Sequence, residues 1–195
     1  MKKTTLFFAL VLVSSAAKVC LLPSFNASAQ EKPKREIIQA QAMGQNTAMG
    51  KTFNVTVNIE SYSTPEDQKT LMDAFTSGGH AALVKTLSKM KSKGRVAITG
   101  TIGYNIAYLR SFETEDGRRI RLVTDRPIHI KEAMNSGRSK DYDLSAIEIN
   151  LKNDPKQSDG SLIVAGKFRI DKDQQIQFES YGSGPWRLTN VMERN

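Results

Sequence analysis

The chain is poor in the residue types that carry most enzyme and metal chemistry. Its 195 residues include one cysteine, Cys20, and two histidines, His80 and His129. One cysteine cannot form an intrachain disulfide, and a zinc site needs three or four Cys, His or carboxylate ligands. No carboxylate stands at a zincin-like spacing from either histidine. The sequence therefore predicts no metal site and no cofactor, and a fold that depends on its hydrophobic core.

The motifs of common nucleophiles and nucleotide sites are also missing. There is no Gly-x-Ser-x-Gly, no Gly-x-Gly-x-x-Gly and no Walker-type loop. Asp171 and Asp173 lack the glycine and the closing glutamate of a calcium loop, and indicate a hairpin turn. We predict no catalytic residue from these patterns. A site assembled from residues that are distant in the sequence stays open as an alternative.

The N-terminus has the three parts of a secretory signal peptide. Lys2 and Lys3 precede an apolar run, Leu6–Val13, and Ala27-Ser28-Ala29 forms an Ala-x-Ala cleavage site. We predict a signal peptide over residues 1–29 and export to the periplasm or the extracellular space. A membrane anchor is the alternative, but Lys18 interrupts the run and a span needs about 20 apolar residues. The mature chain is expected to have no transmembrane span.

The net charge is mildly basic. The formal charge is +8, and removing the three lysines of residues 1–29 from the 28 basic side chains leaves 25 against 20 acidic ones, or +5. This excess suits contact with an anionic envelope surface. Because a nucleic-acid-binding domain usually clusters its charge more strongly, we expect no specific nucleic acid as a partner.

Behind the predicted signal peptide, the composition divides the chain into a linker and one folded domain. Residues 30–51 are polar and show no period, which predicts a flexible linker, with a short helix near 36–43 as the alternative. Residues 52–195 form the predicted single domain. Its first strand, 53–59, alternates apolar and polar side chains. Thr64 and Pro65 begin a helix, and Gly78-Gly79 separates it from a second helix that runs to about residue 93.

The remaining strands alternate in the same way. The predicted strands lie at 53–59, 96–108, 119–122, 144–151, 162–170 and 176–178, and the segment 96–108 is either one long bent strand or two strands that meet near 100–103. The segment after Trp186 is a short apolar tail. Hairpins join consecutive strands, so we predict an α+β fold: a curled antiparallel sheet of about seven strands with a two-helix insertion after the first strand. The predicted core consists of Val57, Leu87, Ile98, Ile106, Leu122, Ile149, Val164, Phe168 and Trp186.

Two binding hypotheses arise from the middle strands. Arg119 and Arg121 share one strand face and, with nearby Arg110, can meet an anionic surface. The alternative is a solvated face, neutralised by Glu113, Glu115 and Asp116 across the hairpin. The second hypothesis is a small apolar ligand held by a curled sheet, with Tyr104 and Tyr108 on its wall. The candidate ligand-binding residues are Tyr104, Tyr108, Arg110, Arg119 and Arg121.

Several segments resemble a group of small exported bacterial proteins to which no function is assigned. The likeness lies in residues 52–61 (TFNVTVNIES), 92–100 (SKGRVAITG), 119–128 (RIRLVTDRPI) and Pro185-Trp186. It covers nearly the whole mature chain and implies bacterial export and one domain, but it brings no catalytic residues. We therefore expect an exported, non-enzymatic binding or envelope-associated domain. The alternative is a small secreted or periplasmic hydrolase with an unrecognised active site.

Overall fold

The structure is a computed structural model, and it describes residues 35–44, 52–128, 142–170, 176–181 and 185–194. The predicted signal peptide, residues 1–29, lies outside these ranges. The elements in chain order are β1 (Glu36–Met43), β2 (Thr52–Ile59), α1 (Pro65–Leu87), β3 (Gly94–Ile98), β4 (Tyr104–Thr114), β5 (Gly117–Thr124), β6 (Leu144–Lys152), η1 (Pro155–Gln157), β7 (Asp159–Ile170), β8 (Ile176–Ser180) and β9 (Trp186–Arg194).

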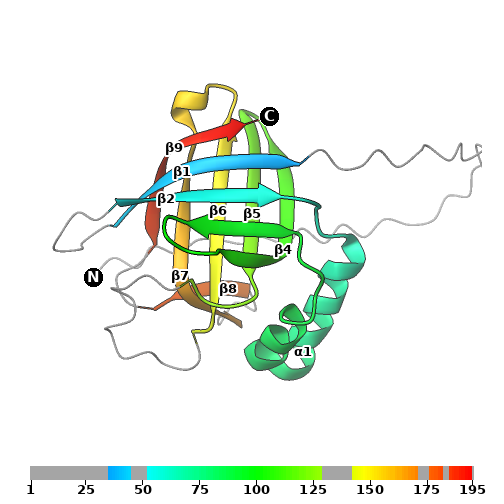
Figure 1. The fold of residues 1–195 in the computed structure, drawn as a ribbon. Coiled ribbons are helices and arrows are strands. Elements are labelled where there is room, and N and C mark those ends of the chain that lie inside the picture. The colour runs from blue at the N-terminus through cyan, green and yellow to red at the C-terminus, as the bar shows by residue number, and fades with distance from the viewer. Residues whose placement is uncertain (1–34, 45–51, 129–141, 171–175, 182–184, 195) are drawn as a thin grey trace, which may run out of the picture.

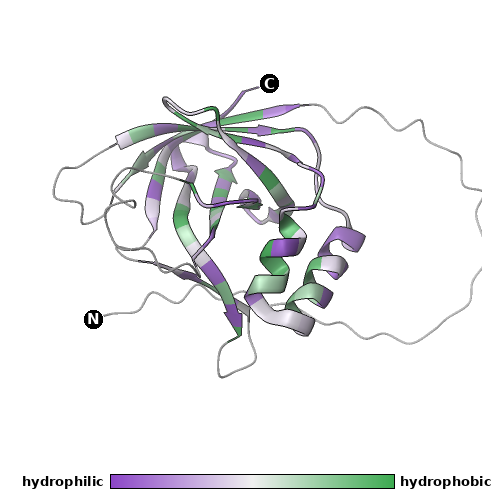
Figure 2. Cartoon of the chain, turned by 60° about the horizontal axis from the view of Figure 1, so that its bottom comes forward, coloured by the Kyte–Doolittle hydropathy of each residue, from purple (hydrophilic) through white to green (hydrophobic). Residues whose placement is uncertain are grey.

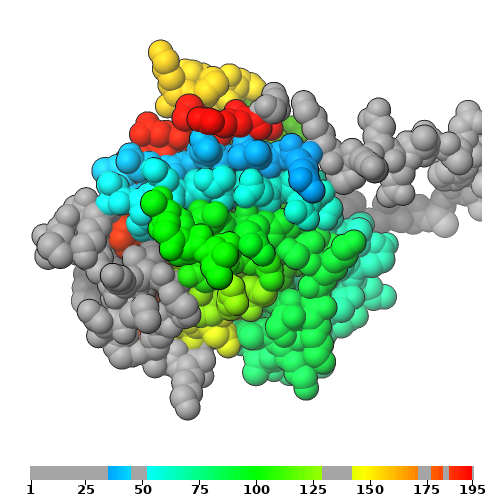
Figure 3. All heavy atoms as spheres, viewed as in Figure 1, coloured from blue at the N-terminus to red at the C-terminus, as the bar shows by residue number. Residues whose placement is uncertain are grey.

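The strands form one closed antiparallel barrel. Their order is β6-β5-β4-β3-β2-β1-β9-β7-β8, and an additional pairing between β6 and β7 closes eight of them into a ring. The ninth strand, β8, pairs only with the end of β7, over residues 166–170. In Figure 1, β1 and β2 cross in front of β5, β6 and β7. In Figure 3 the same strands form successive bands down the front of the molecule, from β9 (red) through β1 and β2 to green.

The predicted fold class is wrong in two respects. The sheet is a closed barrel rather than an open curled sheet of about seven strands, and one α-helix, α1, stands in place of the two-helix insertion. Gly78 and Gly79 do interrupt α1, because their dihedral angles are not helical. However, the helix continues on both sides of this break, and Figure 2 shows two arms joined at a bend.

The prediction of a linker over residues 30–51 is wrong for the part that forms β1. This strand lies between β2 and β9 and faces the interior with Ile38, Ala40 and Ala42. Two of its three inward side chains are alanine, so the segment lacks the strong apolar alternation of the other strands. The apolar tail after Trp186 is the second missed strand, β9, which pairs with β1 and β7.

A bulge in β4 changes which residues face inward. The β4–β5 register shifts between Ile106 and Tyr108. Tyr104 and Ile106 before the bulge, and Leu109 after it, lie in the interior cluster. Tyr108 lies on the outside, packed against the cluster beneath α1. A bulge adds one residue to one strand and so reverses the alternation beyond it. The prediction that Tyr104 and Tyr108 share one wall is therefore wrong.

Two apolar clusters hold the domain together. The larger fills the barrel with inward side chains from β1 to β7 and β9, and the smaller lies between α1 and the outer surface. From α1 the smaller cluster includes Leu71, Phe75, Leu83 and Leu87. The predicted core residues are buried, except that Phe168 is partly buried in this smaller cluster. The helix begins with a capping box, in which Thr64 and Asp67 each accept a hydrogen bond from the other's backbone N–H.

Replacing Gly94 by alanine is expected to destabilise the barrel by about 3 kcal/mol. Gly94 has φ of 151°, and an added Cβ would lie 2.1 Å from the carbonyl oxygen of Asn58 on β2. Gly100→Ala is the control, because its φ is 83° and nothing lies within 4 Å of an added Cβ. That variant should lose only about 1 kcal/mol, the cost of the positive φ. Urea unfolding measures both values, and equal losses would contradict the close packing of β3 on β2.

Candidate functional site

Four side chains form a cationic and aromatic group on the outer surface of β4 and β5. We call Arg110, Phe112, Arg119 and Arg121 the arginine–phenylalanine patch. The register of the hairpin places Arg110 opposite Arg121 and Phe112 opposite Arg119. Ile120 and Leu122 point into the barrel, so their neighbours Arg119 and Arg121 point outward. The two-residue turn at Glu115 and Asp116 fixes this register, as the sequence predicts.

The aromatic ring at the centre of the patch is partly open to solvent. The side chain of Phe112 is 39% exposed. The guanidinium carbons of Arg110 and Arg121 lie over its ring, each 5.7 Å from the centroid. This distance is within the range of a cation–π interaction. The ring therefore helps to hold two guanidinium groups side by side, although both carry positive charge.

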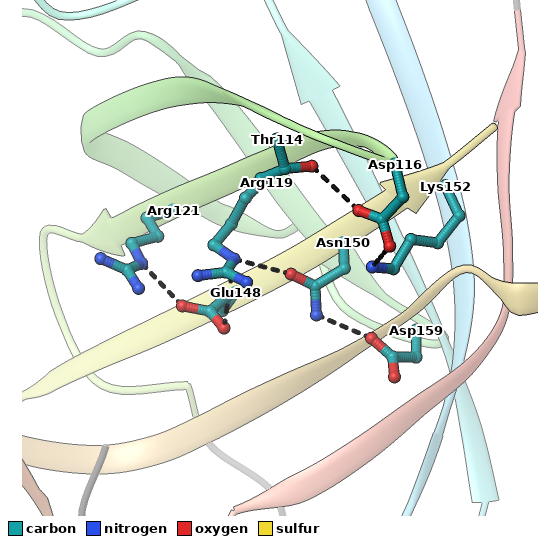
Figure 4. Close-up of polar contacts among 8 residues, drawn as sticks. All are labelled: Thr114, Asp116, Arg119, Arg121, Glu148, Asn150, Lys152 and Asp159. Atoms are coloured by element: carbon teal, nitrogen blue, oxygen red, sulfur yellow. Dashed lines mark hydrogen bonds and ion pairs between the residues drawn. The ribbon is translucent and has the colours of Figure 1, made fainter. Parts of the chain in front are cut away.

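One carboxylate, Glu148 on β6, pairs with two of the three arginines. Nε of Arg121 donates to Oε2 of Glu148 on β6 at 2.6 Å, while Nε of Arg119 lies 3.9 Å from Oε1 of that residue. Nε of Arg119 also donates to Oδ1 of Asn150 at 2.9 Å. Figure 4 shows these contacts side by side on β5 and β6. Arg110 donates from Nη1 to the neutral Oε1 of Gln68 on α1, at 2.6 Å. Among the described residues, Arg119 and Arg121 thus share one carboxylate, and the guanidinium group of Arg110 contacts a neutral amide.

Asp116 and Glu113, two of the acids expected to neutralise Arg119 and Arg121, do not pair with them. Asp116 pairs with Lys152 of β6 and accepts a hydrogen bond from Thr114 (Figure 4). The hydrogen bond that Lys152 donates to Asp116 is the main reason why the pKa of the Asp116 carboxyl lies below its usual range. Glu113 lies opposite Arg118 in the register, on the inward phase of β4. Neutralisation comes from Glu148, on the next strand, and not from across the hairpin.

The two candidate tyrosines are separated from each other. Tyr104 is buried in the barrel, with the guanidinium carbon of Arg126 5.4 Å from its ring centroid. Tyr108 lies outside, next to Arg110; burial raises the pKa of its hydroxyl, and the charge of Arg110 opposes this rise. The structure therefore brings Arg110, Arg119 and Arg121 together around Phe112, with Tyr108 at the border and Tyr104 elsewhere.

A second polar cluster lies at one end of the barrel interior. It consists of Glu36 on β1, Tyr62 before α1, Arg118 on β5 and Glu193 on β9, and we call it the barrel-end network. Arg118 donates from Nη2 to Oε2 of Glu36 at 2.6 Å and to Oε1 of Glu193 at 2.8 Å. The hydroxyl of Tyr62 donates to Oε1 of Glu36 at 2.9 Å. Sequence reasoning missed this network, because the strands that carry the two glutamates were not predicted.

The environment of the barrel-end network shifts two pKa values. Burial, followed by the hydrogen bond to Glu36 and the charge of Glu36, raises the pKa of Tyr62 to about 12. Burial alone would lower the pKa of Arg118, but the contacts with Glu36, Tyr62 and Glu193 outweigh it and raise that pKa. The network therefore holds a permanent cation between two carboxylates and keeps the phenol protonated.

His80 ties α1 to the barrel. Its Nε2 lies 2.7 Å from Oδ1 of Asp143, and its Nδ1 accepts from the backbone N–H of Phe168 at 3.2 Å. The proton therefore belongs on Nε2, which donates to Asp143. Since both ring nitrogens are engaged, this histidine has no nitrogen left to take a proton from a substrate. The other histidine, His129, lies outside the described residues.

Within the described ranges, no three His, Cys, Asp or Glu side chains are grouped so that they could hold a metal ion. No helix in that part of the chain has the length and apolar character needed to cross a bilayer. No family model, curated protein or solved structure matches the chain.

The pKa of Tyr62 should depend on Glu36. The absorbance at 295 nm is followed against pH for the wild type and for Tyr62→Phe. The difference between the two curves reports the Tyr62 phenol and should have its midpoint near pH 12. Glu36→Gln should lower that midpoint, because the phenol loses a charged acceptor. Glu193→Gln is the matched control, since it removes a charge from the network without touching Tyr62, and it should shift the midpoint less. Equal shifts in both variants would contradict the geometry.

This raised pKa also sets a pH dependence of stability. The unfolded chain releases the Tyr62 proton near pH 10, whereas the folded chain keeps it until about pH 12. The free energy of unfolding should therefore fall as the pH rises between these values. Tyr62→Phe should show a shallower fall over the same interval.

Arg118→Met should destabilise the protein by about 2 kcal/mol, because it leaves two carboxylates facing each other. The side chains of Arg118 and Glu36 are 24% and 19% exposed, so we expect less than for a fully buried pair. In a double-mutant cycle of urea unfolding, Arg118→Met with Glu36→Gln should lose less than the sum of the two single losses. Simple additivity would show that the two side chains do not interact.

Proposed function

We propose that this protein is an exported, non-enzymatic binding module that attaches to an anionic surface through the arginine–phenylalanine patch. The single observation that carries this proposal is the grouping of three arginine side chains beside one partly exposed ring. The guanidinium groups of Arg110 and Arg121 lie over the ring of Phe112, and Arg119 is the residue opposite Phe112 in the hairpin. Glu148 pairs with both Arg119 and Arg121. Export is the part of the proposal that rests on the N-terminal sequence alone.

The hydrogen bonds of the patch leave donors available to a ligand. Arg119 is held through Nε, and among the described residues its two terminal nitrogens make no further hydrogen bond. Arg110 donates from Nη1 to Gln68, and its side chain is also hydrogen-bonded to Tyr108. A guanidinium group has five N–H donors in a fixed fork that matches carboxylate, sulfate or phosphate oxygens. Anchoring one nitrogen of each group also reduces the side-chain entropy that binding would remove.

The patch is built on rigid elements. Its residues come from β4 and β5, which pair along most of their length, and its partners come from β6 and α1. A site on paired strands is positioned more precisely than one on a loop. The hydrolase alternative has less support, because His80 uses both ring nitrogens in contacts that join α1 to the barrel.

Replacing two arginines of the patch should weaken binding to a soluble polyanion. Arg110→Gln with Arg119→Gln should raise the Kd for heparin about tenfold at low salt, since each contact with a surface charge contributes up to about 1 kcal/mol. Isothermal titration or fluorescence anisotropy measures this change. Added salt should weaken the wild type more than the variant, because screening acts on the contacts that were removed.

The matched control removes the same charge from other parts of the surface. Arg95 lies on β3, where its guanidinium donates to the Ile102 carbonyl, and Arg169 lies on β7, 52% exposed. Arg95→Gln with Arg169→Gln should leave the heparin Kd within about twofold of wild type. If both double variants lose affinity equally, net charge and not the patch drives binding. If the wild type does not bind heparin at low salt, the proposal fails.

A further inference from the structure

The patch combines charge with an exposed aromatic ring, which narrows the kind of anionic surface it fits. Phe112 is 39% exposed although its neighbours are charged and polar. Besides holding the guanidinium groups of Arg110 and Arg121, the ring gives the patch an apolar surface that is partly open to solvent. Charged side chains around an aromatic ring are, by contrast, typical of proteins that lie on a lipid bilayer, where the ring enters the interface and the cations meet the headgroups.

The same geometry is less favourable for a polysaccharide. Sugars that bind aromatic residues stack on the face of the ring, and the guanidinium carbons of Arg110 and Arg121 already lie over the ring of Phe112. A bilayer needs only the exposed part of the ring. The patch also lies on the outer surface of the β4–β5 hairpin, close to its two-residue turn. That position leaves the ring on a surface that can lie against a membrane.

We infer that the arginine–phenylalanine patch binds the phosphate headgroups of an anionic bilayer, with Phe112 entering the interfacial layer. This inference rests on the proposed function and specifies its partner. Arg119 supplies the open guanidinium end, and Arg110 supplies the second cation beside the ring. Each arginine near an anionic leaflet strengthens binding about fivefold, and an inserted phenyl ring adds roughly tenfold.

The test compares vesicles with a soluble polyanion. The full chain is mixed with phosphatidylglycerol–phosphatidylcholine vesicles, with pure phosphatidylcholine vesicles, and with heparin. Phe112→Ala should weaken partitioning onto the anionic vesicles about tenfold and change the heparin Kd by less than twofold. All variants share the same N-terminal segment, so its own membrane affinity cancels when they are compared. Arg110→Gln with Arg119→Gln should weaken both interactions.

The matched control for the ring is Ile102→Ala, which removes an apolar side chain that is 88% exposed in the β3–β4 connection. It should leave vesicle partitioning unchanged. A direct readout is Phe112→Trp, whose fluorescence should be quenched by brominated lipids. The native tryptophan, Trp186, is 5% exposed and provides an unquenched background.

The outcomes separate this inference from the proposed function. If the protein binds heparin through the arginines but does not bind the anionic vesicles, the lipid inference is wrong and the anion-binding function stands. The same conclusion holds if Phe112→Ala partitions onto the vesicles as the wild type does. Equal losses of vesicle and heparin binding in Phe112→Ala would also overturn it, because the ring would then support the arginines only. If the arginine variant changes neither interaction, both proposals fail.

Discussion

Closure of the barrel depends on one strand, β1, which pairs along its length with β2 and with β9. Without β1 the sheet would have two open edges, one on β2 and one on β9, and exposed strand edges promote aggregation. The inward side chains of β1 are small, Ala40 and Ala42 next to Ile38, and this suits a barrel of eight strands, whose interior is just wide enough for side chains to fill. Glu36, at the start of the strand, then reaches Arg118 across the barrel end. One strand thereby completes both the apolar interior and the polar network at its end.

The parts of the fold that sequence could predict are those where alternation continues unbroken. Strands β2, β5 and β6 fit this description, and so does the tight turn between β4 and β5. The prediction failed where alternation changes phase or lacks large apolar residues. In β9, Leu188 and Val191 both face inward although an odd number of positions separates them, because Asn190 adopts a φ of 51° at a register shift. In β4 the bulge near Ala107 has the same effect on Tyr108. Bulges are fixed by tertiary pairing, so a single sequence gives little sign of them.

The candidate site was also predicted in part: its position on β5 followed from alternation, but the partners of its arginines did not. Alternation on β5 correctly placed Arg119 and Arg121 on one face, since Ile120 and Leu122 are strongly apolar and fix the phase. Their carboxylate partner could not be predicted, because Glu148 lies on a strand that is distant in the sequence and its register is set by pairing. Arg118, directly before Arg119, belongs to the barrel-end network, whose glutamates lie on the two strands that were missed. Three arginines within four residues therefore serve two different purposes. The pleat separates them, and no property of composition distinguishes them.

This separation shows how the proposed binding surface is compatible with the stability of so small a domain. Arg118 is held by two carboxylates at the end of the interior, so its charge is balanced where burial would make an unpaired charge costly. Arg119 and Arg110 stand on the outer surface, where solvent reduces the cost of charge and neutral side chains, Asn150 and Gln68, accept their hydrogen bonds. Because β5 presents alternate residues to the interior and to solvent, its inward positions carry stability, and in the proposed function its outward positions carry recognition. Phe112 belongs to the second group: it is an apolar side chain outside the core clusters, with two guanidinium groups over its ring. In the proposed function, this arrangement, which the core does not require, is the part of the molecule that meets the anionic surface.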